Sequence, residues 1–199
     1  MAVTAAPPRN EAAVYTPLTP HIGCRVDGVD IAQPMSDGAF SRLRRALADH
    51  TVLVLPGQQI TPEQHIAFSR RFGPLEDHVL SDFCLPGHPE IFVVSNIIEN
   101  GRHIGAYGGS KRYHSDLSYL EEPSLGSLFY CLECPTGTGQ TAFASMQGAF
   151  AALPDDLRQR LLALNAVHDY VWNYERSHTT RPPLSAEQMA KTPPIAHPA

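Results

Sequence analysis

The stretch Tyr113-His114-Ser115-Asp116 places an imidazole and a carboxylate two residues apart, near the middle of the chain. Residues two apart on a β-strand point to the same face, so this spacing predicts two side chains that converge on one cavity. A histidine and an acidic residue are two members of the 2-His-1-carboxylate triad, which holds non-haem Fe(II) with open coordination positions. We therefore predict that His114 and Asp116 bind a metal ion.

The segments on either side of this motif predict the elements that would surround such a site. A glycine-rich loop, suited to the rim of a site, occupies residues 101–109 before it. After it, the apolar residues 125–132 predict a buried strand. Two glycines then predict a tight turn into a short strand at Thr141, which leads to a helix from about residue 145 to 164, broken at Pro154.

The remaining elements are short. Ser36 and Thr61 are typical N-caps, and Gln64 stands where it completes a capping box with Thr61. The patterns predict strands near residues 15–18, 24–26, 51–55 and 91–95, helices after Ser36 and from Thr61 to Gly73, an extended stretch at 166–172 and an irregular segment from Arg181. Several short strands with two early helices predict an α+β fold related to the jelly roll.

This series of motifs resembles the TauD/TfdA (taurine dioxygenase-like) family of Fe(II)/2-oxoglutarate-dependent dioxygenases. The family pattern is W-H-[TS]-D, a strand, G-G-D-T-x-[FW]-x-x-[ML] and then A-A-Y-x-A-L. This chain has Y-H-S-D, then G-Q-T-A-F-A-S-M at 139–146 and G-A-F-A-A-L at 148–153. The resemblance also covers residues 23–31, 61–64, 71–75 and 193–198. It implies a double-stranded β-helix (jelly-roll) core with flanking helices in residues 15–199. The Ala/Pro-rich composition of residues 1–14 predicts a disordered tail before this core.

The resemblance implies an oxidoreductase that uses Fe(II), O₂ and the co-substrate 2-oxoglutarate. Such an enzyme hydroxylates a small organic, here anionic, substrate and releases succinate and CO₂. In that scheme His114 and Asp116 hold the iron, and Thr141 hydrogen-bonds a carboxylate of 2-oxoglutarate. Tyr113 and His78 take positions that contact the substrate.

In the family, the pattern continues beyond the part that resembles residues 193–198, and there it supplies the distal histidine ligand and an arginine that binds 2-oxoglutarate. We therefore expect this chain to be C-terminally truncated, to lack both residues and to turn over 2-oxoglutarate poorly by itself. His168 and His178 are the downstream histidines that could replace the missing ligand. Strands left without partners favour self-association, so we also consider a homo-oligomer.

Two alternatives remain open from the residues. The first is a non-catalytic fragment of the same fold that binds iron weakly or not at all. The second is a zinc-type hydrolase built on His114 and Asp116, which would need another ligand and a general base. Release of succinate and CO₂ from 2-oxoglutarate distinguishes the dioxygenase from both.

The composition indicates which kinds of partner the chain is unsuited to bind. The chain has 199 residues, of which 43% are hydrophobic, enough for one sizeable core. Its net charge of −5 argues against a nucleic-acid-binding surface. No apolar run approaches the ~20 residues that span a bilayer, and the first residues lack the pattern of a signal peptide. We expect a cytoplasmic protein without a membrane partner.

The four cysteines, at positions 24, 84, 131 and 134, form neither a disulfide framework nor a zinc motif. Cys131 and Cys134 have C-x-x-C spacing, but residues three apart on a predicted strand face opposite sides. We expect buried or half-buried thiols.

Overall fold

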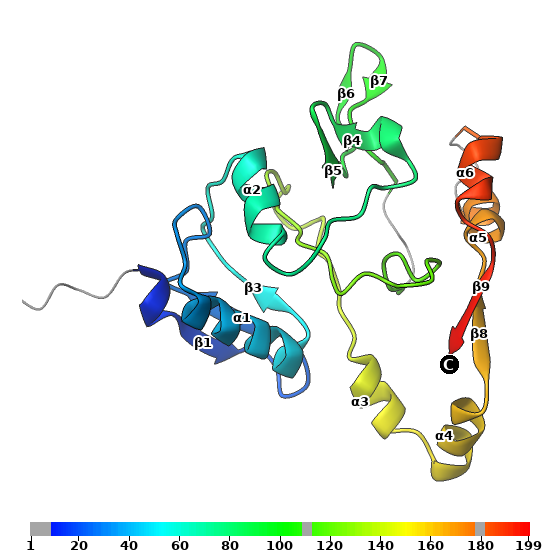
Figure 1. Ribbon diagram of the computed structural model, residues 1–199, viewed down its shortest axis with the longest axis horizontal. Helices are drawn as coiled ribbons and strands as arrows, with labels where there is room; N and C mark the ends of the chain where they lie inside the picture. The colour runs from blue at the N-terminus through cyan, green and yellow to red at the C-terminus, as the bar shows by residue number, and fades with distance from the viewer. Residues whose placement is uncertain (1–8, 109–112, 178–181) are drawn as a thin grey trace, which may run out of the picture. The chain divides into compact units, whose positions relative to one another are not determined.

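The computed structural model describes residues 9–108, 113–177 and 182–199 (Figure 1). The chain divides into two compact units. Unit 1 comprises Met1–Pro74 with Glu133–Ala149, and unit 2 comprises Leu75–Leu132 with Phe150–Ala199.

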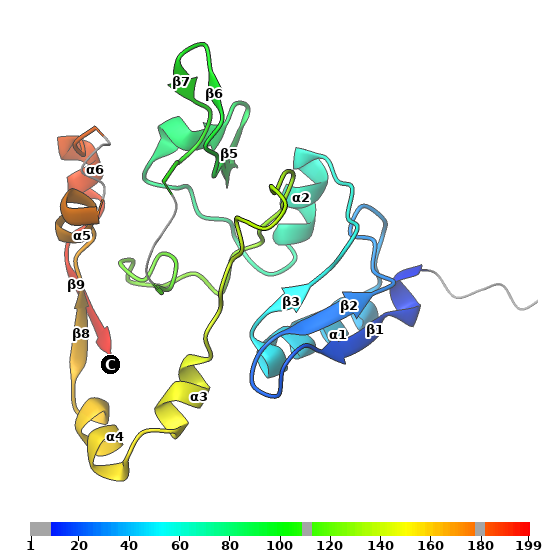
Figure 2. The same cartoon turned by 180° about the vertical axis from the view of Figure 1, so that it is seen from behind.

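Unit 1 is a small three-stranded sheet with a helix on one face. Its strands are β1 (Val14–Pro17), β2 (Cys24–Asp27) and β3 (Leu53–Val54), in the order β1-β2-β3. β1 runs antiparallel to β2, whereas β3 runs parallel to it. The helix α1 (Asp37–His50) lies in front of this sheet in Figure 1 and behind it in Figure 2. The strands predicted near 15–18 and 24–26 are thereby confirmed.

Both helix starts predicted for unit 1 are confirmed, because each is set by local chemistry. The Ser36 side chain accepts a hydrogen bond from the backbone N–H of Ala39 and caps α1. At the start of α2 (Pro62–Ser69), Thr61 and Gln64 form the reciprocal capping box. α2 ends at Ser69, earlier than the predicted end at Gly73-Pro74.

The helices of unit 1 meet in an aromatic cluster. The rings of Phe40, Phe68 and Phe72 pack edge to face, with centroids 4.8–6.2 Å apart. The Arg71 guanidinium lies 4.2 Å from the centroid of Phe40 and also pairs with Asp37 at 3.0 Å. One cation therefore connects the end of α2 to the first turn of α1.

Ordered structure begins earlier than the tail predicted for residues 1–14. A 3-10 helix, η1 (Arg9–Ala12), precedes β1. Its Asn10 is only 3% exposed; it donates to the carbonyls of Asp30 and Pro34 and accepts from the N–H of Asp30. A buried amide that saturates three backbone groups fixes this segment, so the prediction of disorder is wrong from residue 9 onward. Residues 1–8 lie outside the described residues.

Unit 2 is built from short two-stranded ladders. β4 (Cys84–Leu85) pairs with β5 (His88–Phe92), β6 (Ile98–Glu99) with β7 (Arg102–His103), and β8 (Asn165–His168) with β9 (Ile195–Pro198), all antiparallel. The other elements along the rest of the chain are η2 (Ser81–Phe83), α3 (Met146–Ala151), α4 (Asp155–Leu162), α5 (Tyr170–Ser177) and α6 (Ala186–Ala190). The predicted break at Pro154 falls between α3 and α4 and is confirmed.

The prediction of a buried strand over residues 125–132 is wrong. This run has no regular secondary structure, and Leu125, Phe129 and Leu132 are 71%, 70% and 79% exposed. Thr141 likewise lies in an irregular, exposed stretch rather than in a short strand. A strand needs a hydrogen-bonding neighbour, and no described segment pairs with either stretch.

Helices replace two stretches that were predicted to be extended or irregular. β8 ends at His168, because the next residue, Asp169, caps a helix: its carboxylate accepts a hydrogen bond from the N–H of Trp172. The helix α5 therefore begins within the stretch 166–172 that was predicted to be extended. The segment after Arg181 contains α6, whose Ser185 forms a second capping box with Gln188. That box was present in the sequence as Ser-x-x-Gln.

Gln188 uses both ends of its side-chain amide. Its Oε1 accepts from the N–H of Ser185, and its Nε2 donates to the carbonyl of Val79 at 3.1 Å. The cap of α6 thereby also attaches this helix to the segment before η2.

The cysteines differ from the prediction in exposure. Cys24 is buried and Cys84 half-buried, as expected, but Cys131 and Cys134 are both exposed. Cys131 lies in the run 125–132 that was wrongly predicted to be a strand, and Cys134 lies just beyond it. Within the described residues, no helix is long and apolar enough to cross a membrane.

Candidate metal-binding site

The two predicted metal ligands face each other. His114 Nε2 lies 3.1 Å from Asp116 Oδ1, although the residues lie in a loop and turn rather than on the predicted strand. Both side chains are about half exposed, at 54% and 56%. Residues two apart therefore converge here through the bend of the loop and not through strand pleating.

The chain reverses direction directly after Asp116. Leu117 has a φ of 54°, a left-handed conformation that is uncommon for a leucine. The backbone N–H of Leu120 then donates to the carbonyl of Leu117 at 3.0 Å and closes the turn. We call residues 116–120 the Asp116 turn.

A third side chain fixes the orientation of the carboxylate. The Ser127 hydroxyl donates to Asp116 Oδ2 at 2.9 Å, while Oδ1 faces His114. Ser127 was not predicted as a site residue, because it lies within the apolar run that was predicted to be a buried strand. A single polar residue inside an apolar run was the signal that could have identified it.

The spacing of the two donors fits a divalent metal ion. Donor atoms bound about 2.1 Å from an ion, at right angles, lie about 3.0 Å apart. The measured 3.1 Å between His114 and Asp116 matches this value, and an imidazole with a carboxylate is a suitable donor pair for Fe(II). The same separation allows a hydrogen bond, so a bound metal would take the place of the proton between these atoms.

The structure brings together two donors and not three. In residues 9–108, 113–177 and 182–199, no cluster of three or more His, Cys, Asp or Glu side chains could hold a metal ion. His168 therefore does not join His114 and Asp116 as a third ligand. The other histidine considered, His178, lies outside the described residues.

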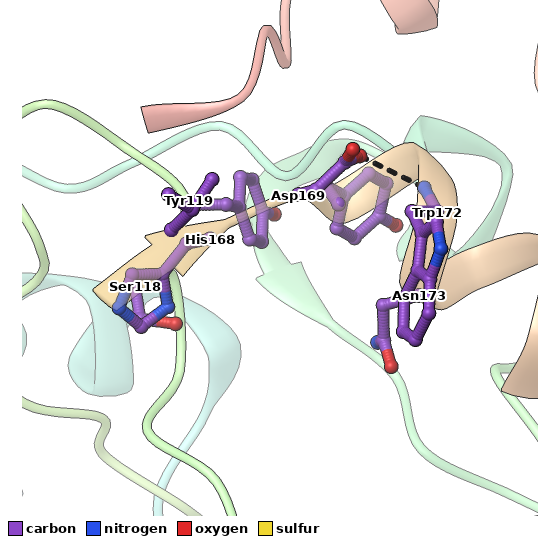
Figure 3. Close-up of a pocket in the computed structure, with 8 residues that line it drawn as sticks. Ser118, Tyr119, His168, Asp169, Trp172 and Asn173 are labelled. Atoms are coloured by element: carbon purple, nitrogen blue, oxygen red, sulfur yellow. Dashed lines mark hydrogen bonds between the residues drawn. The ribbon is translucent and has the colours of Figure 1, made fainter. Parts of the chain in front are cut away.

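The Asp116 turn also contributes to a cavity of about 490 Å³ in unit 2. Figure 3 shows Ser118 and Tyr119 of the turn beside residues of β8 and α5. The other residues that line this cavity are Val167, His168, Asp169, Tyr170, Trp172 and Asn173. Burial, and to a smaller extent the charge of Asp116, raises the pKa of Tyr119 to about 12. His114 and Asp116 themselves do not line this cavity.

The predicted substrate residue His78 lines a second cavity, of about 280 Å³. Its ring stacks on Phe92 with centroids 3.9 Å apart, and its Nδ1 accepts from the N–H of Leu80. Lys191, at the end of α6, and Cys84 belong to the same wall. Burial, and to a smaller extent the charge of Asp77, raises the pKa of the Cys84 thiol, which keeps this thiol uncharged at neutral pH.

The other two predicted site residues are exposed. Tyr113 is 73% exposed, directly before His114 in the same loop. Thr141 belongs to unit 1, whereas His114 and Asp116 belong to unit 2. The roles of Tyr113 and Thr141 stay predictions.

Comparison with known proteins identifies relatives of this chain. Pentalenolactone F synthase of Streptomyces avermitilis is 36% identical over 158 residues, which are 77% of this chain and 52% of that protein. An (S)-phenoxypropionate/α-ketoglutarate-dioxygenase of Sphingobium herbicidovorans is 32% identical over 166 residues, 83% of this chain and 56% of that protein. The chain thus spans about half the length of these relatives.

A solved structure shows the same fold. A Burkholderia xenovorans structure assigned as an α-ketoglutarate-dependent 2,4-D dioxygenase matches with a TM-score of 0.69 and 25% identity, over 94% of this chain and 64% of that one. The mixed α and β elements described above therefore follow the dioxygenase fold that was expected. The family model described as taurine catabolism dioxygenase TauD, TfdA family matches residues 15–199. On this evidence the chain belongs to the TauD/TfdA family of dioxygenases.

Proposed function

We propose that His114 and Asp116 bind Fe(II) in a 2-oxoglutarate-dependent dioxygenase. The observation that carries this proposal is the 3.1 Å separation of His114 Nε2 and Asp116 Oδ1. Family membership and a relative whose name includes α-ketoglutarate, another name for 2-oxoglutarate, support the choice of metal and co-substrate. The proposed overall reaction converts R–H, O₂ and 2-oxoglutarate into R–OH, succinate and CO₂.

The bound iron supplies the oxidising chemistry, and the side chains of this chain supply binding and orientation. His114 offers a neutral imidazole nitrogen and Asp116 a negatively charged oxygen. Ser127 holds the second carboxylate oxygen by its hydrogen bond, which leaves Oδ1 directed at the metal position. Thr141 is proposed to hydrogen-bond a carboxylate of 2-oxoglutarate with its hydroxyl.

The proposed substrate is a small organic anion. His78 lines a cavity whose wall includes the cation Lys191, and Lys191 pairs with Glu187 at 2.8 Å on α6. The stack of His78 on Phe92 holds the imidazole ring in place at this wall. Tyr113 is proposed to place an aromatic ring beside the metal.

Metal titration of the 199-residue chain tests the metal site. Mn(II), which is paramagnetic and stable in air, serves as the probe in an electron paramagnetic resonance titration. We expect saturable binding that His114→Ala and Asp116→Ala each weaken by about tenfold or more, because either change removes one of two protein donors. Asp49→Ala, which removes an exposed carboxylate of α1, is the matched control. Equal binding by all four proteins would refute the site.

A second candidate, a non-catalytic family member, is favoured by one observation: the described residues bring two donors together and not three. Succinate release from 2-oxoglutarate with Fe(II) distinguishes the candidates. We expect Mn(II) binding with slow succinate release from this chain. Rapid, iron-dependent release that depends on His114 would refute the non-catalytic candidate, and it would require a third ligand that the described residues do not show.

A further inference from the structure

The far end of the Asp116 turn is held from β9. His197 Nε2 lies 2.9 Å from the carbonyl oxygen of Leu120, the last residue of the turn. A carbonyl oxygen only accepts hydrogen bonds, so Nε2 must carry the proton and donate it. One half-buried imidazole thereby joins the turn to a strand 77 residues further along the chain.

A ring contact attaches the turn to the same part of unit 2. Tyr119 packs against Tyr170 with centroids 4.3 Å apart, and Tyr170 is the first residue of α5, directly after β8. Tyr119, His168 and Asp169 line the same cavity at this junction (Figure 3). β8 is the antiparallel partner of β9, so both contacts end on one ladder and the helix that follows it.

The turn needs such external contacts. Leu117 holds a left-handed conformation that costs energy for a side chain with a Cβ atom, and strain of this kind persists only where the surroundings impose it. Inside the turn, the described backbone hydrogen bond is the one from Leu120 to Leu117. Without β9 and α5, the turn would relax, and Asp116 stands at its first position.

We propose that His197 is a positioning residue for Asp116: by donating to Leu120, it holds the turn in the conformation that keeps Asp116 Oδ1 beside His114. The expected effect on metal affinity rests on the proposed function. The hydrogen bond from His197 to Leu120 does not depend on that function. His197 does not touch the metal position and acts through the backbone of the turn.

Three substitutions in the full chain test this role. His197→Leu removes the donor, and His197→Asn carries an amide that is too short to reach Leu120. His197→Gln can place its Nε2–H where the imidazole Nε2–H stood. His21→Leu, at an exposed histidine of unit 1, is the control.

The first measurement is amide hydrogen exchange, which needs no metal. We expect the Leu and Asn variants to exchange the backbone amide of Leu120, the turn amide with a described hydrogen bond, about fivefold faster, as the loss of one hydrogen bond implies. The Gln variant and the His21→Leu control should match the wild type. If the Leu variant does not fold, the Asn and Gln pair still decides. Unchanged exchange in the Asn variant, or a Gln variant as fast as the Asn variant, would overturn the proposal.

The second measurement is Mn(II) affinity, with about fivefold weaker binding expected for the Leu and Asn variants and wild-type binding for the Gln variant. Faster exchange together with unchanged affinity would overturn the positioning role while leaving the metal site intact. A wild-type chain that binds no Mn(II) would instead refute the proposed function. In that case the exchange data alone decide whether His197 holds the turn.

Discussion

The Ser127 hydroxyl donates a 2.9 Å hydrogen bond to Asp116 Oδ2, and the other oxygen of the same carboxylate faces His114. Ser127 lies eleven residues beyond Asp116, in a stretch where Leu125 and Phe129 are exposed. A side chain that orients a ligand oxygen in this way acts on the metal through the geometry of that ligand.

Ser127→Ala should weaken the binding of Mn(II) by about tenfold, because the carboxylate would lose the contact that restricts its rotation. The titration described above measures the change. Ser127→Thr keeps the hydroxyl and should bind like the wild type. An Ala variant with wild-type affinity would show that Asp116 is oriented by other contacts.

The raised pKa of Tyr119 predicts a loss of stability at alkaline pH. In the unfolded chain a tyrosine ionises near pH 10, whereas burial raises the pKa of Tyr119 in the folded chain to about 12. Its contribution to stability is therefore complete below about pH 10 and is lost as the pH rises to about 12. Tyr119→Phe should remove this part of the pH dependence.

Urea unfolding at several alkaline pH values checks this prediction, and tyrosinate absorbance follows the ionisation directly. Asp116→Asn should lower the pKa of Tyr119 only slightly, because the charge of Asp116 is the smaller of its two causes. A Phe variant that loses stability over this range as steeply as the wild type would contradict the assignment to Tyr119.

Thr61→Ala should reduce the free energy of unfolding by about 1 kcal/mol, through loss of the cap on α2. Thr61→Ser preserves the hydroxyl and should change stability little. Chemical denaturation of the two variants provides the comparison. Equal losses in both would mean that the methyl group of Thr61, and not its cap, is what stabilises the helix.

The exposed apolar side chains of residues 125–132 predict self-association at high protein concentration. Phe129→Ser should shift sedimentation velocity profiles toward the monomer, since it removes one of the largest exposed groups. Leu18→Ser, at an exposed leucine of unit 1, is the matched control and should shift them less. Concentration-independent sedimentation of the wild type would exclude association through this surface.

The features that the sequence predicted correctly depend on neighbours in the chain. Ser36 and Thr61 cap helices through groups three residues away, and Pro154 separates two helices. The side chains of His114 and Asp116 converge, as their spacing predicted, although a loop and not a strand brings them together. Their role as metal ligands stays a prediction. Local chemistry is visible in a single sequence because its partners are adjacent.

The features that it missed depend on distant partners. The run 125–132 has the composition of a strand, but composition does not supply the neighbour that a strand requires. The hydrogen bond from His197 to Leu120 spans 77 residues, and the sequence around either residue does not predict it. Even the tail was misjudged for this reason, since Asn10 is ordered by Asp30, twenty residues away.

The side-chain amide of Gln188 caps α6 with its oxygen and attaches the helix to Val79 with its nitrogen, so one substitution can remove the attachment and keep the cap. Gln188→Glu keeps an oxygen for the cap of α6 but loses the N–H that reaches Val79, so the helix would persist while its attachment opened. Lys191 at the end of α6 and Val79 both belong to the wall of the cavity beside His78. One amide proton of Gln188 thus ties together two parts of that cavity wall that come from segments 109 residues apart in the chain.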